Sequence, residues 1–535
     1  MKEYVLPLCL MLCIVASCHR DSSKPDVTIT VNTNKVVSQM QGGFGASIHA
    51  IEDSIVVSSD KGNYRSWGGS VWGANPQLTD DASWNKVFEY CDWLGLDWCR
   101  VEVEHRMYKP ERNVFDTTCH EMQVLYKWLD YCQDRDIDIF LTEMWPNVEW
   151  LAFDSFKGSD LGVLLSAPND FQAWANGYAA ILEYLIEDRG YTCIKWISIA
   201  NEPMEHWSWW KAADGTPQNI TPGLQAMNAE IQKRDLPVKL VAPDGNLLYD
   251  KNGVLNQNII DCIAHAGAVS SHNYQTQFDW DEKASTNKMA NLTLVLEEWK
   301  KLAVQSGNKP LFVGEFGSFL YGIERDTDGP TRYLSLLKDA QFVIRSSQVG
   351  IDAYNKWSLL NRGDLDGQWQ LINTWDVNKH ALLPTEEISP NKNGINMYGM
   401  FPRFTSKYAK VIETKTVGSA DSTFTFQNVY GGTETLQHVF ATCFQCPNTG
   451  NYSVFVTNDS QKSYTAQICF EGLQANLPLY VYEINEAQKD SSELLLQPLQ
   501  TIALDGSDKC NVIINPMSVM CLSNFNLSLN AVGVR

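Results

Sequence analysis

The chain has 535 residues, 44% of them hydrophobic, with a formal charge of -21 and a pI near 4.9. Such a length and apolar content exclude a fibrous or disordered protein and favour one large domain with a smaller companion. The acidic excess argues against nucleic acid or an anionic membrane surface as a partner, because both would be repelled. The charge does not exclude neutral ligands. The 18 Trp and 21 Tyr could stack on sugars or fill a core.

The N-terminal residues are typical of an export signal. Residues 1–17 combine Lys2 with a short apolar run that ends in small residues, and this run is too short to span a bilayer. Residues 15–18 resemble the lipobox of bacterial lipoproteins, in which the cysteine is lipidated, here Cys18. We therefore expect a signal peptide at 1–17, a lipidated Cys18 with a tether over 18–25, and a lipoprotein exported to the outer membrane, facing the periplasm or the exterior. The alternative is a plain signal peptide with a chance cysteine. We expect membrane contact only through this lipid anchor.

The cysteines give no disulfide framework. Of the 14, all but Cys9, Cys13 and Cys18 lie in the remaining chain, an odd number without dense spacing. The one close pair is Cys443 and Cys446, which lacks a second pair or a histidine doublet for zinc. A local disulfide and two free thiols are the alternatives, and we expect no metal and no cofactor.

Apolar strand-like runs alternate with helical periodicity from residue 42 to residue 404. After a glycine-rich first run at 42–49, strands are predicted at 98–104, 137–143, 193–200, 238–242, 268–272, 311–314 and 351–357. Helices are predicted at 81–94, 119–135, 224–234, 258–266, 292–304 and 331–347, with a further one that Asn169 caps and that runs to 188. Eight alternations predict a (β/α)8 TIM barrel over 42–404. A doubly wound open sheet is disfavoured because no glycine-rich phosphate loop opens the first helix.

Short β-rich runs replace the helical pattern from about Thr405. Their spacing predicts a C-terminal β-sandwich over 405–535. Residues 26–41 include an alternating strand at 27–31, and we expect it to join the sandwich because a strand ahead of the barrel has no other apolar surface to bury it.

Two glutamates end apolar strands of the predicted barrel. Glu202 follows the fourth strand and precedes Pro203, and Glu315 follows Gly314 in the seventh strand. Catalytic groups in such barrels lie at the carboxyl ends of the strands, and paired carboxylates are what glycoside hydrolysis needs. The competing interpretation is two acids that only form ion pairs, but buried acids are costly without a purpose.

These surroundings resemble a known group of enzymes. The stretches 201–203 and 314–317 are similar to the signatures of clan A retaining glycoside hydrolases, and Arg100, His272, Tyr274 and Trp357 match at the ends of strands two, six and eight. The stretches 43–47 and 398–408 further resemble glycoside hydrolase family 30 and its relatives.

The resemblance implies a retaining β-glycosidase that acts by double displacement. Glu202 would be the acid/base and Glu315 the nucleophile, on an oligo- or polysaccharide of β-linked glucan, xylan or galactan type. Arg100 would favour the charged form of Glu315, Tyr274 would orient it, and Asn201 would hold the sugar 2-hydroxyl. Another substrate-binding candidate is His272, which could equally be a scaffold group. Five tryptophans are further candidates: Trp357 as an apolar floor, Trp145, and Trp207 with its neighbours Trp209 and Trp210.

Rival interpretations remain at the site and for the function. Glu143 and Asp244 also end predicted strands, but neither has the flanking pattern of the two glutamates. A glycan-binding surface lipoprotein with an inactive barrel is the alternative from another class, and a transglycosylase would use the same residues as the hydrolase.

Overall fold

The computed structural model describes residues 24–535, except 51–65, 68–69, 72, 147, 159, 205–209, 246–255, 277–287, 320–329, 361–368, 377–378, 380, 393, 428–432, 474–476, 505, 507, 530–532 and 535. The predicted signal peptide, Cys18 and most of the tether lie outside this part of the chain, as does Trp207. Within it, no helix combines the length and the apolar character needed to cross a bilayer.

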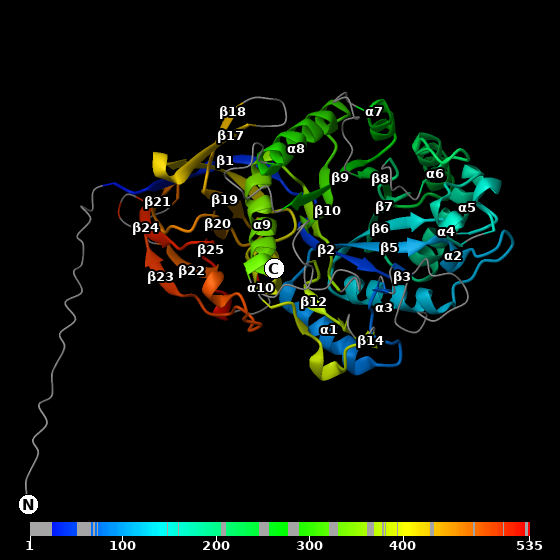
Figure 1. Ribbon diagram of the computed structural model, residues 1–535, viewed down its shortest axis with the longest axis horizontal. Helices are drawn as coiled ribbons and strands as arrows, with labels where there is room; N and C mark the ends of the chain where they lie inside the picture. The colour runs from blue at the N-terminus through cyan, green and yellow to red at the C-terminus, as the bar shows by residue number, and fades with distance from the viewer. Residues whose placement is uncertain are drawn as a thin grey trace, which may run out of the picture.

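Eight parallel strands close into a barrel in the order β10-β11-β2-β5-β6-β7-β8-β9 (Figure 1). The strands are β2 (Phe44–His49), β5 (Trp98–Glu104), β6 (Asp138–Trp145), β7 (Ile194–Ser198), β8 (Lys239–Gly245), β9 (Ala268–Thr276), β10 (Leu311–Phe319) and β11 (Ala353–Lys356). Each contains most of a strand expected from the sequence, and the predicted (β/α)8 barrel is confirmed.

Helices connect successive barrel strands: α1 (Asp81–Leu94), α3 (His120–Asp134), α5 (Phe171–Glu183), α6 (Thr221–Arg234), α7 (Gln257–Ala264), α8 (Lys288–Gln305) and α9 (Pro330–Ser346). Shorter helices are α2 (His105–Tyr108), α4 (Asp160–Leu165) and α10 (Gly394–Phe404). The predicted cap of α5 is wrong by one residue. Asp170 accepts a hydrogen bond from the Ala173 N–H at 3.0 Å, whereas Asn169 donates to the Ala152 carbonyl. A charged oxygen satisfies the free N–H groups of a first turn and also interacts well with the helix dipole.

The barrel interior changes character along its axis. Trp98, Phe140 and Phe312 belong to one buried aromatic cluster inside the barrel, with Trp98 and Phe140 stacked at 5.8 Å. Further along β5 the alternate residues Arg100 and Glu102 are fully buried and charged. The carboxyl end of the barrel is therefore polar, as an active site of this fold requires.

A nine-stranded sheet follows the barrel, in the order β23-β22-β25-β20-β19-β16-β1-β21-β24. Its members are β1 (Val27–Gln39), β16 (Lys410–Gly418), β19 (Val439–Gln445), β20 (Tyr452–Asn458), β21 (Tyr464–Glu471), β22 (Pro478–Asn485), β23 (Gln500–Ala503), β24 (Lys509–Ile514) and β25 (Ser518–Ser523). β1 pairs antiparallel with β16 and parallel with β21. Strands from both ends of the sheet contribute to one apolar core, as in a sandwich, and the predicted C-terminal β fold is confirmed.

The barrel and the sheet lie side by side, with α9 between them (Figure 1). Tyr333 of α9 donates to the Met517 carbonyl at 2.6 Å. Phe44 of β2 packs against Phe444 of the sheet, with ring centroids 5.8 Å apart. Smaller pairs are β3 (Ser66–Trp67) with β4 (Ser70–Val71), β12 (Ile372–Asn373) with β15 (Ser389–Pro390), β13 (Trp375–Asp376) with β14 (Ala381–Leu382), and β17 (Thr423–Gln427) with β18 (Thr433–Gln437). Cys443 and Cys446 are both free thiols.

Candidate active site

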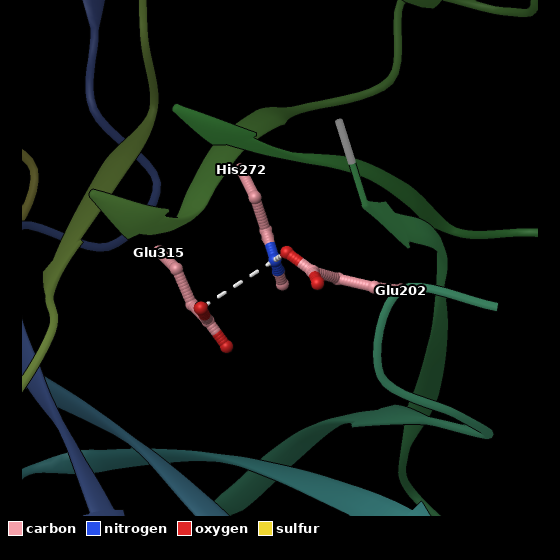
Figure 2. Close-up of side chains that lie close together, drawn as sticks. All are labelled: Glu202, His272 and Glu315. Carbon is pink, nitrogen blue, oxygen red and sulfur yellow. Dashed lines mark hydrogen bonds and ion pairs between the residues drawn. The ribbon is translucent and has the colours of Figure 1, made fainter. Parts of the chain in front are cut away.

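The two glutamates singled out in the sequence converge at the carboxyl end of the barrel. One oxygen of Glu202, one oxygen of Glu315 and one ring nitrogen of His272 lie within 4.8 Å of one another. Figure 2 shows the side chains of His272 and Glu315 approaching from two strands and that of Glu202 from the loop after β7. Retaining glycosidases hold their carboxyl groups about 5–5.5 Å apart, whereas inverting enzymes separate them by about 6.5–9.5 Å to admit a water. The spacing of Glu202 and Glu315 therefore suits a retaining enzyme better than an inverting one.

The backbone at Glu202 turns sharply after β7. Its φ of 45° lies in the left-handed region, which costs a residue with a side chain about 1–2 kcal/mol. The Glu202 N–H donates to the Asp244 carbonyl at 2.9 Å, so β8 holds this turn in place. The side chain is 12% exposed, enough to meet a ligand at the barrel mouth.

Glu315 owes its position to an irregularity in β10. The pairing of β10 with β9 shifts register between Val313 and Glu315, at Gly314. A Cβ on Gly314 would lie 2.2 Å from Ser270 Oγ and 2.7 Å from Asp244 Oδ1. Only glycine fits there without a rearrangement of these neighbours.

Arg100 is fully buried and holds groups from several strands together. Its Nη1 donates to Glu315 Oε1 at 2.8 Å and also to Glu102. Its Nη2 donates to Asn201 Oδ1 at 2.8 Å and to Asp244 Oδ2 at 2.9 Å. Although burial disfavours the charge, the surrounding carboxylates keep the pKa of Arg100 above its ordinary value. The structure thus places Arg100 beside Glu315, where the sequence predicts it.

Groups around Glu315 act in both directions on its pKa. Burial and the nearby negative charges of Glu202 and Glu102 raise it to about 7, against the lowering effect of His272 and Arg100. The Tyr274 hydroxyl donates to Glu315 Oε2 at 2.6 Å and so favours the ionised form.

His272 bridges carboxylates through both ring nitrogens. Nδ1 lies 2.9 Å from Glu202 Oε1 and 3.6 Å from Glu315 Oε2, and Nε2 lies 3.0 Å from Asp244 Oδ1. Burial disfavours the imidazolium, but Glu315 and Asp244 outweigh it and raise the pKa of His272 to about 10. His272 is therefore a cation between the two glutamates at neutral pH.

This trio does not suit a metal ion, although its atoms are close enough together to surround one. A histidine ligand must offer a free nitrogen lone pair, and both ring nitrogens of His272 already face carboxylates at hydrogen-bond distance, Nδ1 that of Glu202 and Nε2 that of Asp244. Arg100 adds a fixed positive charge next to Glu315.

Two tryptophans and a buried lysine form a group that reaches Tyr274, the hydrogen-bond donor to Glu315. Trp357, just after β11, is 2% exposed and packs edge-to-face on His49 at 4.9 Å. Lys356 donates to the carbonyl oxygens of Trp357 at 2.6 Å and Trp369 at 3.1 Å. The Trp369 ring lies 5.7 Å from that of Tyr274, which brings this aromatic group to the edge of the acid pair.

The remaining tryptophan candidates have different outcomes. Trp145 ends β6, but its side chain, like the whole of Trp207 and Trp209, lies outside the described residues. The prediction for Trp210 is wrong, because Trp210 is fully buried and packs edge-on against Trp174 at 5.6 Å. An indole next to the site in sequence can serve as core when the chain turns inward.

The two rival acids are both fully buried and bonded to protein groups. Glu143 pairs with His105 at 2.8 Å and accepts a hydrogen bond from the Trp174 indole. Asp244 contacts Arg100, Ser270 and His272. Glu143 is part of the scaffold, whereas Asp244 touches the supports of both central glutamates.

Sequence reasoning missed Glu102 and its partner His49, whose Nδ1 lies 2.5 Å from Glu102 Oε2. A signal for Glu102 was present. Arg100, Glu102 and Glu104 alternate with apolar residues in a strand that the barrel buries entirely. Charges at every second position of a buried strand indicate an interior polar site.

The fold and the convergent acids define a class of protein, a (β/α)8 barrel with a β-sandwich and two strand-end glutamates. No protein-family model matches the chain, and no curated protein matches its sequence. Solved structures do share its fold. An α-L-arabinofuranosidase from Thermotoga maritima aligns with a TM-score of 0.62 at 12% identity, over 93% of this chain and 99% of its own.

A GH30 endoxylanase from Clostridium papyrosolvens C71 aligns with a TM-score of 0.57 at 14% identity, over 93% of this chain and 99% of that one. SrfJ from Salmonella typhimurium gives 0.58 at 12% identity, over 95% and 94%. The fold is thus that of the glycoside hydrolases that the sequence motifs resemble.

Proposed function

We propose that this protein is a retaining glycoside hydrolase with Glu202 as the acid/base and Glu315 as the nucleophile. The observation that carries the proposal is the approach of one oxygen from each carboxylate to within 4.8 Å, with His272 beside both. The shared fold with a xylanase and an arabinofuranosidase supports it.

The geometry supports a definite role for each group. Glu315, held by Arg100 and Tyr274, attacks the anomeric carbon while Glu202 protonates the leaving oxygen. Glu202 then deprotonates the water that releases the sugar from Glu315. Asn201 gives its carbonyl oxygen to Arg100, which leaves its amide N–H groups to donate to a sugar hydroxyl.

The proposed substrate is a β-linked glycan of glucan, xylan or galactan type. The solved neighbours add α-L-arabinofuranosides to the compounds worth testing. A panel of aryl glycosides carrying these sugars, followed by the matching polysaccharides, identifies the substrate. Product analysis with excess acceptor sugar separates hydrolysis from transglycosylation.

Glu202→Ala and Glu315→Ala test the assignment. With Glu202→Ala, turnover of substrates with poor leaving groups should fall about 10²–10⁴-fold, and azide should restore activity on activated aryl glycosides with a product of retained configuration. With Glu315→Ala, azide should give the inverted product. Glu143→Gln is the matched control, a buried strand-end acid outside the pair, and should keep its activity. A wild-type protein that binds glycans without turning any over would support the inactive binding protein instead.

We also propose that Cys18 is lipidated and anchors the exported protein in the outer membrane. The lipobox-like residues 15–18 support this proposal. Cys18→Ser should abolish incorporation of labelled fatty acid and release the protein from the membrane fraction. Equal labelling of the two proteins would contradict it.

A further inference from the structure

Asp244 contacts the supports of both proposed catalytic glutamates without belonging to the pair. Its Oδ1 accepts hydrogen bonds from Ser270 Oγ at 2.8 Å and His272 Nε2 at 3.0 Å. Its Oδ2 accepts from Arg100 at 2.9 Å, and its backbone carbonyl accepts the Glu202 N–H at 2.9 Å. Arg100 and His272 in turn contact Glu315 and Glu202, so Asp244 lies at the centre of this network.

The partners of Asp244 decide where the protons of His272 lie. Arg100 can only donate, and with His272 it outweighs burial and keeps the pKa of Asp244 below its usual range. An ionised Asp244 can only accept, so His272 Nε2 must carry a proton. The other nitrogen, Nδ1, then faces Glu202 Oε1 at 2.9 Å and Glu315 Oε2 at 3.6 Å.

We propose that Asp244 is a positioning residue that keeps His272 protonated on both nitrogens and directs its Nδ1–H to the two catalytic carboxylates in turn. The inference rests on the proposed function. Double displacement requires a charged Glu315 and a proton on Glu202 when the reaction starts. In the glycosyl-enzyme Glu315 is a neutral ester and Glu202 is charged.

The charge therefore moves between two groups that one imidazolium can reach. In the first step a Glu315 oxygen bonds to the anomeric carbon, the glycosidic C–O bond breaks, and the leaving oxygen takes the proton of Glu202. In the second step water gives a proton to Glu202, and its oxygen displaces Glu315 from the sugar. One of the two glutamates carries a negative charge at each stage, and the positive charge of His272 stabilises that charge at both stages.

Charged groups from four barrel positions surround His272. Its direct neighbours are three carboxylates: Glu202 after β7, Asp244 in β8 and Glu315 in β10. Arg100 and Glu102 of β5 lie behind them. Tyr274, in the same strand as His272, is uncharged and binds Glu315. Asp244 is the one of the three nearest carboxylates whose charge the reaction leaves unchanged. Asp244 therefore helps to hold the ring protonated in both steps, whichever of the two glutamates carries the charge.

Histidine-selective ¹⁵N NMR of the full chain tests this protonation without any substrate. The His272 signals are identified by their loss in His272→Gln. We expect wild-type His272 to keep both nitrogens protonated from pH 5.5 to pH 8.5. In Asp244→Asn it should titrate within that window, toward the ordinary value near 6.5. A neutral His272 in the wild-type protein at pH 8 would overturn the inference even if Asp244→Asn failed to fold.

Kinetics test the consequence for the reaction. Asp244→Asn should lower kcat by about 10- to 100-fold with little change in KM, and it should move the alkaline limb of the pH profile to lower pH. Glu143→Gln, which removes another buried acid from its histidine, should leave kcat and the profile unchanged. A fall in kcat without a change in the His272 titration would reduce Asp244 to a structural role. An inactive wild-type protein whose His272 titrates as expected would contradict the proposed function and leave the electrostatic role of Asp244 standing.

Discussion

The carboxylate of Glu315 is surrounded by groups with opposite effects on its protonation. Burial and neighbouring acids raise its pKa to about 7, while His272 and Arg100 oppose this rise. A nucleophile has to be ionised, so its activity depends on the balance between these groups. The hydroxyl of Tyr274 is the neighbour that can be removed with the least disturbance, because Phe keeps the ring.

Tyr274→Phe should move the acid limb of kcat/KM to higher pH. In the wild-type protein kcat/KM should fall as the pH drops below about 7, because Glu315 becomes protonated. Losing the 2.6 Å hydrogen bond destabilises the charged form and raises the pKa further, by about one unit. A pH profile on an activated aryl glycoside measures the shift.

Tyr354→Phe is the control for this experiment. The Tyr354 hydroxyl is also buried but pairs with Ser346, so its loss should leave the profile in place. Equal shifts in the two variants, or a shift to lower pH in Tyr274→Phe, would show that Tyr274 does not stabilise the charged Glu315.

Residues with a local motif were the ones that could be predicted from the sequence. Glu202, Glu315 and Arg100 each end or occupy an apolar strand, and the barrel brings them together. The link from Asp244 to His272 depends on how the ends of β8 and β9 meet in space, which strand periodicity does not encode. The prediction that Trp210 binds sugar failed for a related reason, because only the path of its loop decides that its side chain points inward.

At the scale of elements, the irregularity of β10 at Gly314 sets the position of the nucleophile. A regular strand would continue the pairing with β9 without a shift, and Glu315 and the residues after it would then point to the opposite face of the strand. The site therefore depends on a residue that has no side chain of its own.

Gly314→Ala should destabilise the protein by about 1–3 kcal/mol and reduce activity, because its Cβ would lie 2.2 Å from Ser270 Oγ. Gly317→Ala is a matched control in the same strand, since its Cβ would meet its nearest neighbour at 3.5 Å. Denaturant unfolding and an activity assay compare the two. Equal stability of the two variants would mean that the register shift does not need glycine.

Whole strands and helices were predictable because their apolar periodicity is strong over many residues. The α5 cap was not, because Asn169 and Asp170 are both good capping residues and tertiary contacts decide between them. The same limit applies to any element that ends where two polar residues adjoin.

At the scale of the molecule, the barrel and the sheet share an apolar interface and α9. β1 lies inside the sheet although it precedes the barrel in sequence, so the sheet needs both ends of the described chain. We therefore expect the two parts to unfold together.

Ile29→Ala in β1 tests this coupling. Ile29 is fully buried in the sheet core, and its truncation should cost about 2–5 kcal/mol. All 18 Trp precede residue 376, so tryptophan fluorescence reports on the barrel region alone. The fluorescence midpoint in denaturant should fall in Ile29→Ala and stay nearly unchanged in Thr28→Ala, whose side chain faces the other side of the strand. A fluorescence transition that ignores Ile29→Ala would show that the barrel unfolds independently.

The identity of the nucleophile is tested most directly by trapping the covalent intermediate. An activated 2-deoxy-2-fluoro glycoside of the sugar found active in the substrate panel forms a glycosyl-enzyme that hydrolyses slowly, and peptide mass spectrometry locates the label. We predict one sugar per chain, attached to Glu315, and none in Glu315→Ala. A label on Glu202, or steady turnover of the parent substrate without any covalent adduct, would contradict the double displacement through Glu315.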